Sequence, residues 1–142
     1  MKVLIIDDEP DVLLLCRVNF EFAGHEVLEA GEGETGLRLA RDEKPDLVVL
    51  DLMLPRKDGL TVLQELHDEP STAGIPVVLL TAKTQSEDQL RGFQAGADEY
   101  ITKPFSPAVL TNTVERVHGM TEDERAQHRD EAVRQLTGFQ EA

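Results

Sequence analysis

The chain has 142 residues, of which 40% are hydrophobic and 30% charged, and its formal net charge at pH 7 is −14. This length suffices for one domain with its own hydrophobic core, and no apolar run is long enough to span a membrane. The acidic balance argues against direct binding of nucleic acid, because phosphate backbones bind basic surfaces. A single cysteine, Cys16, excludes an internal disulfide and is interpreted as a small buried hydrophobe. With no sign of a secretory leader, we expect a cytoplasmic protein.

Three short apolar runs predict buried β-strands at Val3–Ile6, Leu47–Leu50 and Val77–Leu80. Each run is rich in Val, Ile and Leu and is flanked by polar or turn residues, which is typical of strands covered on both faces of a parallel sheet. Two weaker candidates, Glu26–Glu29 and Glu99–Thr102, bring the number of predicted strands to five.

Helical segments follow the first three strands. Pro10 opens the first helix, which is expected to end at Gly24. Its inward-facing residues are expected to be Val12, Leu15, Cys16 and Phe20. The second and third helices are expected at about 34–42 and 60–67, the third following an Asp-Gly pair.

Two further helices complete the repeat. The fourth is expected to begin at Ser86, with Gln89 completing a capping box, and to end near Gly96. The fifth has Ser106 as its expected N-cap and Pro107 in its first turn. Its apolar face consists of Leu110, Val114 and Val117. Five repeats of strand and helix predict an α/β fold, with a parallel sheet and helices on both faces.

Residues 119–142 differ in character from the rest of the chain. They are polar and acidic overall, and the stretch from Glu122 to Leu136 favours a helix. Its apolar residues, such as Ala126 and Val133, are too sparse for a second core. Three possibilities stay open: a sixth helix packed on the domain, the start of a linker or coiled segment toward a partner, and a solvated, partly frayed helix.

Polar side chains follow four of the predicted strands at the point where each strand ends. They are Asp7, Asp8, Asp51, Thr81 and Lys103. Ligands of open parallel sheets bind beyond the carboxyl ends of the strands, so we expect these residues to form one site. Three carboxylates in one pocket repel one another, so a cation should share it. Mg²⁺, or Mn²⁺ in its place, suits such oxygen ligands.

Other metals and neighbouring residues fit this site less well. Calcium is disfavoured because no DxDxDG loop is present. His25, His67, His118 and His128 are too scattered for a zinc site and are expected to be surface residues. Glu9 is interpreted as a first-turn charge of the helix that follows it, outside the site. A metal and an amine would neutralise phosphoryl oxygens, and a carboxylate nucleophile would become an acyl phosphate.

The residues around this site resemble the receiver domain of two-component response regulators. The resemblance rests on the pair Asp7-Asp8, on Asp51 in VVLDLMLPRKDG with Pro55 and Gly59, on Thr81-Ala82, on Gly96-Ala97-Asp98, and on Tyr100-Ile101-Thr102-Lys103-Pro104-Phe105. It covers about residues 1–118 and leaves 119–142 as a polar, helical extension or the start of a linker. It implies a flavodoxin-like fold with the doubly wound strand order 2-1-3-4-5.

The resemblance also implies a magnesium site around Asp51, the expected phosphoacceptor. Asp8 and Asp51 would bind Mg²⁺ directly, Asp7 mostly through water, and the backbone carbonyl of Met53 would complete the protein ligands. Lys103 would pair with the phosphoryl group, and the peptide bond from it to the following proline is expected to be cis.

Four residues are implied in switching and in phosphoryl lifetime. Thr81 would move toward the phosphoryl oxygen, and Tyr100 would turn inward to fill the space that it leaves. Met53 and Lys83 border the route of the hydrolytic water in the family, and would tune how long the phosphoryl group lasts.

The resemblance implies a signalling switch rather than an enzyme, one that accepts phosphate and loses it slowly. A histidine kinase or phosphotransfer protein would be the donor. A downstream effector protein or an output domain would bind the face made by the fourth helix, fifth strand and fifth helix. The stretch GADEYITKPFSP most resembles the winged-helix, DNA-binding subfamily, in which a homodimer through that face is one possibility. The fifth helix, however, lacks the arginine-rich ending that is common in that subfamily. Some 24 residues after the fifth helix are too few for an output domain, so the chain is either a stand-alone receiver or part of a longer regulator.

Two other functions stay open. A phosphatase of the haloacid-dehalogenase type also uses an aspartate after a parallel strand, but it needs a second aspartate two residues later, where this chain has Met53. A receiver-like interaction module that is never phosphorylated is the other alternative. Such variants usually lose an acidic-pair residue, the acceptor aspartate or the lysine, and here all of these are present.

Overall fold

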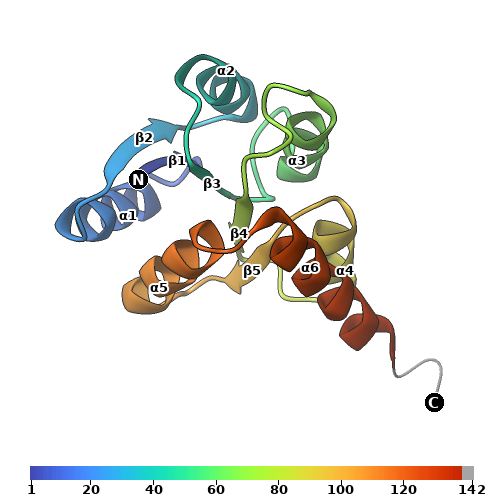
Figure 1. Cartoon of the computed structure of the whole chain (residues 1–142). Helices are drawn as coiled ribbons and strands as arrows, with labels where there is room; N and C mark the ends of the chain where they lie inside the picture. Colours follow the sequence, from blue (N-terminus) through green and yellow to red (C-terminus); the bar gives the residue numbers. More distant parts are fainter. Residues whose placement is uncertain (139–142) are drawn as a thin grey trace.

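Five parallel strands form a single sheet at the centre of the computed structural model, which describes residues 1–138 (Figure 1). The strands are β1 (Lys2–Ile6), β2 (Glu26–Ala30), β3 (Leu47–Leu50), β4 (Val77–Thr81) and β5 (Glu99–Thr102). Their order in the sheet is β2-β1-β3-β4-β5, and every neighbouring pair is parallel. The predicted fold class and strand order are therefore confirmed.

Burial explains why three strands are easier to predict than the other two. β1, β3 and β4 lie in the middle of the sheet, and nearly all of their residues are buried. β2 and β5 are the two edges, and every residue of β5 is only half-buried. An edge strand that is incompletely covered keeps polar side chains, which weakens its apolar pattern.

Six helices accompany the sheet within residues 1–138. They are α1 (Pro10–Phe22), α2 (Gly33–Glu43), α3 (Gly59–Asp68), α4 (Ser86–Gln94), α5 (Pro107–His118) and α6 (Glu122–Thr137). α2 and α3 supply one core cluster with one face of the sheet, and α1 and α5 supply a second cluster with the other face. None of these helices is both long and apolar enough to cross a membrane.

The inward face of α1 differs from the predicted one at two residues, since it includes Leu13 and not Leu15. Cys16 and Phe20 are buried and Val12 packs against the same core, as expected, but Leu15 is 41% exposed. Each residue turns a helix by about 100°, so Leu15 lies on the flank of a face that is centred on Cys16 and Phe20. The prediction for Leu15 was wrong.

The start of α4 also differs from the prediction. Gln85 has the extended backbone of an N-cap, with φ −70° and ψ 147°, so Ser86 is already the first helical residue. The expected capping box of Ser86 with Gln89 is therefore wrong, and α4 has no side-chain cap. The predicted cap of α5 is confirmed, because the Ser106 hydroxyl accepts a hydrogen bond from the Val109 amide at 3.3 Å.

The polar stretch after α5 forms a helix, α6, that packs against α4 (Figure 1). Its start is fixed by a capping box, in which the Thr121 hydroxyl accepts from the Glu124 amide and the Glu124 carboxylate accepts from the Thr121 amide. Of the three possibilities left open by the sequence, the structure therefore has a sixth helix packed on the domain. Residues 139–142 of the predicted extension lie outside the described residues.

Candidate functional site

Three aspartates meet at the carboxyl edge of the sheet, between β1 and β3. These strands pair in parallel with Ile6 opposite Leu50, so the residues that follow, Asp7 and Asp51, are neighbours. Asp7, Asp8 and Asp51 each have a carboxylate oxygen within 4.8 Å of those of the other two. Asp7 and Asp51 are buried and Asp8 is exposed, so the cluster opens to solvent on one side. The predicted gathering of acids is confirmed.

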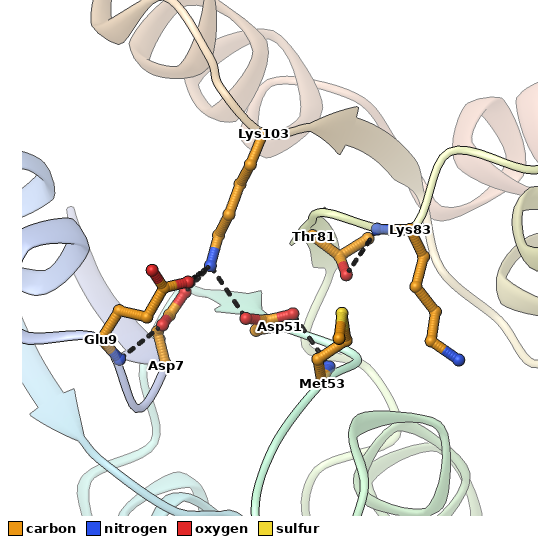
Figure 2. A network of polar contacts seen from close by, with 7 residues as sticks. All are labelled: Asp7, Glu9, Asp51, Met53, Thr81, Lys83 and Lys103. Carbon is orange, nitrogen blue, oxygen red and sulfur yellow. Dashed lines mark hydrogen bonds and ion pairs between the residues drawn. The ribbon is translucent and has the colours of Figure 1, made fainter.

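Lys103 reaches this cluster from the end of β5 (Figure 2). Its Nζ donates to Oδ2 of Asp51 at 2.8 Å, to Oδ2 of Asp7 at 2.8 Å and to Oε1 of Glu9 at 2.7 Å. The peptide bond from Lys103 to Pro104 is cis, as expected. The amine therefore lies where strands from three parts of the chain converge.

Glu9 belongs to this network, which corrects the interpretation of its charge. It is the N-cap residue of α1 and makes no side-chain cap bond. Its backbone amide donates to Oδ1 of Asp7 at 2.9 Å, and its carboxylate turns toward Lys103 (Figure 2). The long Lys103 side chain offers three donors, and Glu9 is close enough to accept one of them.

The electrostatics of the site leave an excess of negative charge. Burial raises the pKa of the Asp7 carboxyl, while hydrogen bonds from Lys103 and from the Glu9 amide partly oppose that rise. Burial acts against the charged form of Lys103 as well, but hydrogen bonds to Asp51, Asp7 and Glu9 outweigh it and raise its pKa. Four carboxylates, counting Asp8, thus face one ammonium, and a divalent cation would offset most of the remaining negative charge.

The donor set of the cluster suits a hard cation. Asp7, Asp8 and Asp51 offer carboxylate oxygens only, which Mg²⁺ and Mn²⁺ prefer. Within residues 1–138, this is the group of His, Cys, Asp and Glu side chains spaced to hold a metal ion, and it contains no nitrogen or sulfur ligand. His25 pairs instead with Glu115, at 2.9 Å. The residues present therefore fit the magnesium ion that the sequence predicts.

The predicted switch residues form a chain of contacts beside Asp51. Thr81 ends β4 and is fully buried, and its hydroxyl accepts from the Lys83 amide at 3.3 Å (Figure 2). The backbone carbonyl of Lys83 accepts from the Tyr100 hydroxyl at 2.7 Å. Burial, together with nearby acidic charge, raises the pKa of the Tyr100 phenol to about 12. Tyr100 is half-buried, with its ring beside Phe93 of α4.

Met53 and Gly59 hold the loop that follows β3 around Asp51. The Met53 amide donates to Oδ1 of Asp51 at 2.9 Å, while the Met53 side chain is 53% exposed. A Cβ on Gly59 would lie 2.1 Å from the backbone oxygen of Asp51, so only glycine allows the loop to close here. The contact of Gly59 with Asp51 was not predicted from the sequence, although the Asp-Gly pair at the start of α3 marks a tight turn.

The fold and the cluster together define the class of protein. It is a doubly wound α/β domain with an acidic, magnesium-compatible site where the strand order reverses, between β1 and β3. A model of the response regulator receiver domain matches residues 3–115. The chain belongs to this family, whose members are signalling modules rather than classical enzymes.

Individual relatives agree with this assignment. Over 104 residues the chain is 50% identical to "DNA-binding dual master transcriptional regulator RpaA" of Synechocystis, a match that covers 73% of this chain and 43% of that protein. It is 41% identical over 116 residues to "Alkaline phosphatase synthesis transcriptional regulatory protein PhoP" of Bacillus subtilis, covering 82% and 48%. The chain thus spans about half the length of the curated relatives that it matches.

Two solved structures are similar both in fold and in sequence. The BeF3-activated N-terminal receiver domain of Klebsiella pneumoniae RstA has a TM-score of 0.79 and 31% identity, over 84% of this chain and all of that one. The receiver domain of sensor histidine kinase PA1611 from Pseudomonas aeruginosa, with a magnesium ion in its active site cleft, has a TM-score of 0.77 and 26% identity, over 84% and 98%.

Proposed function

We propose that Asp51 accepts a phosphoryl group from the phosphohistidine of a histidine kinase or phosphotransfer protein, and that this transfer switches partner binding. The placement of Asp51 carries the proposal. It is buried at the carboxyl edge of the sheet, with Oδ2 on Lys103 and Oδ1 on the Met53 amide. In the transfer, an Asp51 oxygen bonds to phosphorus as the bond from phosphorus to the histidine nitrogen breaks, and the imidazole keeps that electron pair.

The residues around Asp51 would align the transfer and neutralise its charge. The Lys103 amine, which donates to carboxylates in this structure, would donate to phosphoryl oxygens as well. The Thr81 hydroxyl would donate to a further phosphoryl oxygen. Asp8 and Asp51 would hold Mg²⁺ or Mn²⁺ directly, Asp7 through water, with the Met53 carbonyl as a further ligand. The ion would supply positive charge against the phosphoryl oxygens. A magnesium ion in the related PA1611 receiver supports this assignment.

The switch would run from Thr81 through Tyr100 to the face made by α4, β5 and α5. Phosphorylation adds charge beside Thr81, and movement of Thr81 would change the space available to Tyr100. Met53 and Lys83 border the approach to Asp51 and would tune how long the phosphoryl group lasts. The beryllium fluoride form of the RstA receiver supports activation by a phosphoryl-like group in this family.

The output lies with partners of this chain. The relatives are about twice as long and carry the names of transcriptional regulators, so an output domain or a separate effector protein would read the switch. We place the receiver in residues 1–118 and the extension in 119–142. The net charge of −14 favours protein partners over nucleic acid, in a cytoplasmic setting. A homodimer through α4, β5 and α5 would compete with α6 for part of that surface.

The two alternative functions have less support. A haloacid-dehalogenase phosphatase would need an acid where Met53 stands, with its side chain largely exposed. A module that is never phosphorylated would not need the buried Asp51 with its lysine partner.

Intact-mass measurement after incubation with acetyl phosphate tests the proposal. The wild type should gain about 80 Da per phosphoryl group with Mg²⁺ and nothing with EDTA. Asp51→Asn should gain nothing and stay folded, because Lys103 keeps Asp7 and Glu9 as partners. Asp58→Asn is the matched control, since asparagine also caps α3, and it should behave as the wild type. An unmodified wild type in the presence of Mg²⁺, or a modified Asp51→Asn, would contradict the proposal.

A further inference from the structure

α6 is anchored to the domain by ion pairs at the start of β5. Arg129 pairs with Oδ1 of Asp98, and the Nε of Arg125, one helical turn earlier, lies 3.6 Å from the same oxygen. Asp98 is 4% exposed, and its other oxygen accepts from the Val77 amide at 2.9 Å. Two arginines of α6 therefore balance a buried carboxylate that is built into the sheet.

A second anchor joins α6 to both β5 and α5. Glu99 is the first residue of β5, and its Oε2 lies 3.1 Å from Nε2 of His128 in α6. The same oxygen accepts from Arg116 of α5 at 2.8 Å. α6 thus lies beside α4 (Figure 1) and pairs with the acids at the start of β5, on the surface that α4, β5 and α5 share.

The apolar contact beneath α6 is shallow. Ala132 and Leu136 of α6 line one groove with Phe93 of α4 and Tyr100 of β5. Within α6, no residue is fully buried. Because polar anchors and half-buried side chains hold the helix, its detachment exposes little apolar surface and costs far less than unfolding the domain.

The groove beneath α6 is connected to the phosphorylation site. Thr81 accepts from the Lys83 amide, and the Lys83 carbonyl accepts from Tyr100, whose ring lines the groove. A shift of Thr81 toward a phosphoryl group would move the Lys83 backbone and, through it, the ring on which α6 rests.

We propose that α6 is a reversible cover of the α4–β5 surface, closed in the unphosphorylated chain and released when Asp51 is phosphorylated. Release would expose Asp98 and Glu99 to a partner helix with the chemistry of α6, with arginines four residues apart beside small apolar residues. Charge complementarity selects this partner, because α6 itself supplies Arg125 and Arg129 to Asp98. The inference rests on the proposed function, since it takes phosphorylation of Asp51 as the trigger.

Hydrogen exchange of the full chain, followed by mass spectrometry, tests the release. Peptides from α6 should be protected in the unphosphorylated wild type. They should exchange at least about tenfold faster after treatment with acetyl phosphate and Mg²⁺. Peptides from β1 and β3 should keep their protection in both states, because these strands form the buried centre of the sheet.

Charge reversals on α6 separate its anchor from general effects on the helix. Arg129→Glu should speed exchange in α6 before any phosphorylation, because it puts a carboxylate against Asp98. Arg134→Glu is the matched control: Arg134 pairs with Glu131 of the same helix, so its loss leaves the Asp98 anchor in place. Tyr100→Phe keeps the ring but loses the bond to Lys83, so it should accept phosphate and release α6 less than the wild type.

The outcomes distinguish the two proposals. Full phosphorylation by mass with unchanged protection of α6 would overturn the release and leave the proposed function standing. Equal exchange in Arg129→Glu and Arg134→Glu would overturn the anchor at Asp98. A wild type that gains no mass would contradict the proposed function and, with it, the trigger for release.

Discussion

Lys103 is the only cation in contact with the acid cluster, among the residues that the structure describes. Its side chain is 10% exposed, and Lys103→Ala would leave Asp7 and Asp51 buried without a counter-charge. Without metal, we expect the free energy of unfolding to fall by about 3 kcal/mol. Added Mg²⁺ should still bind and restore part of this loss, while activation of a partner is lost.

Urea unfolding with EDTA and with Mg²⁺ measures this effect. The control is Lys83→Ala, which removes an exposed lysine and should change the free energy of unfolding by less than about 0.5 kcal/mol. Equal stability of the two variants in EDTA would show that Lys103 does not balance the cluster.

The buried carboxyl of Asp7 should make the stability of the chain depend on pH. Its pKa in the folded chain is raised by burial, so the neutral form favours folding and ionisation opposes it. The contribution of neutral Asp7 to the free energy of unfolding is therefore present at pH values below the ordinary aspartate pKa. It is lost as the pH rises through the pKa of Asp7 in the folded chain. Asp7→Asn cannot ionise, so in EDTA it should gain stability over the wild type as the pH rises above the ordinary aspartate pKa.

The same substitution should weaken Mg²⁺ binding, because it removes a negative charge that would hold the ion through water. Unfolding curves in EDTA at several pH values, with a Mg²⁺ titration at pH 7, test both effects. A stability difference between wild type and Asp7→Asn that stays constant with pH would contradict the role given to burial.

At the scale of single residues, the sequence could predict those site residues whose positions follow from the sheet. Asp7, Asp51 and Lys103 follow strands directly, so the carboxyl edge brings them together whatever their rotamers. Glu9 was missed because its participation depends on side-chain torsions and on the reach of Lys103. Neither can be deduced from spacing along the chain.

At the scale of elements, the turn from β3 into α3 is packed against Asp51 itself. Gly59→Ala would push a methyl group to 2.1 Å from the Asp51 oxygen and 2.5 Å from the Cα of Leu52. We expect a loss of about 1–3 kcal/mol in the free energy of unfolding, and slower phosphorylation, because the loop must shift.

Gly74→Ala is the control, since an added Cβ there meets nothing within 4 Å. Thermal unfolding and the rate of mass gain with acetyl phosphate compare the two variants. If Gly59→Ala phosphorylated as fast as Gly74→Ala, the loop would not position Asp51 as described.

A strand or helix could be predicted where its burial gives the sequence a regular apolar pattern. β1, β3 and β4 are covered on both faces and could be assigned directly. The docking of α6 could not, because it depends on ion pairs of Asp98 and Glu99 with arginine and histidine about 30 residues away. The predicted cap of α4 was wrong for a local reason: the extended backbone at Gln85 moves the start of the helix by one residue.

At the scale of the whole molecule, Cys16 is buried in the core cluster that α1 and α5 form with the sheet, so the reactivity of its thiol reports unfolding of that core. Burial raises the pKa of the thiol to about 12, and the nucleophile in alkylation is the thiolate. At pH 8.5 the native chain should therefore resist iodoacetamide, whereas the urea-unfolded chain should react at the rate of an ordinary cysteine, with a pKa of about 8.5. Mass spectrometry after timed quenching measures the two rates, and similar rates would show that the core around α1 opens readily.

The proposed function of the whole molecule depends on which carboxylate takes the phosphoryl group. Borohydride reduces an acyl phosphate to an alcohol, so a phosphorylated aspartate becomes homoserine, lighter by about 14 Da than aspartate. We would treat the chain with acetyl phosphate and Mg²⁺, reduce it, and map the change by peptide sequencing in a mass spectrometer. Phosphorylation of Asp51 should give homoserine at position 51 alone, and none with EDTA. Homoserine at position 7 or 8, or a phosphorylated chain in which Asp51 stays unreduced, would contradict it.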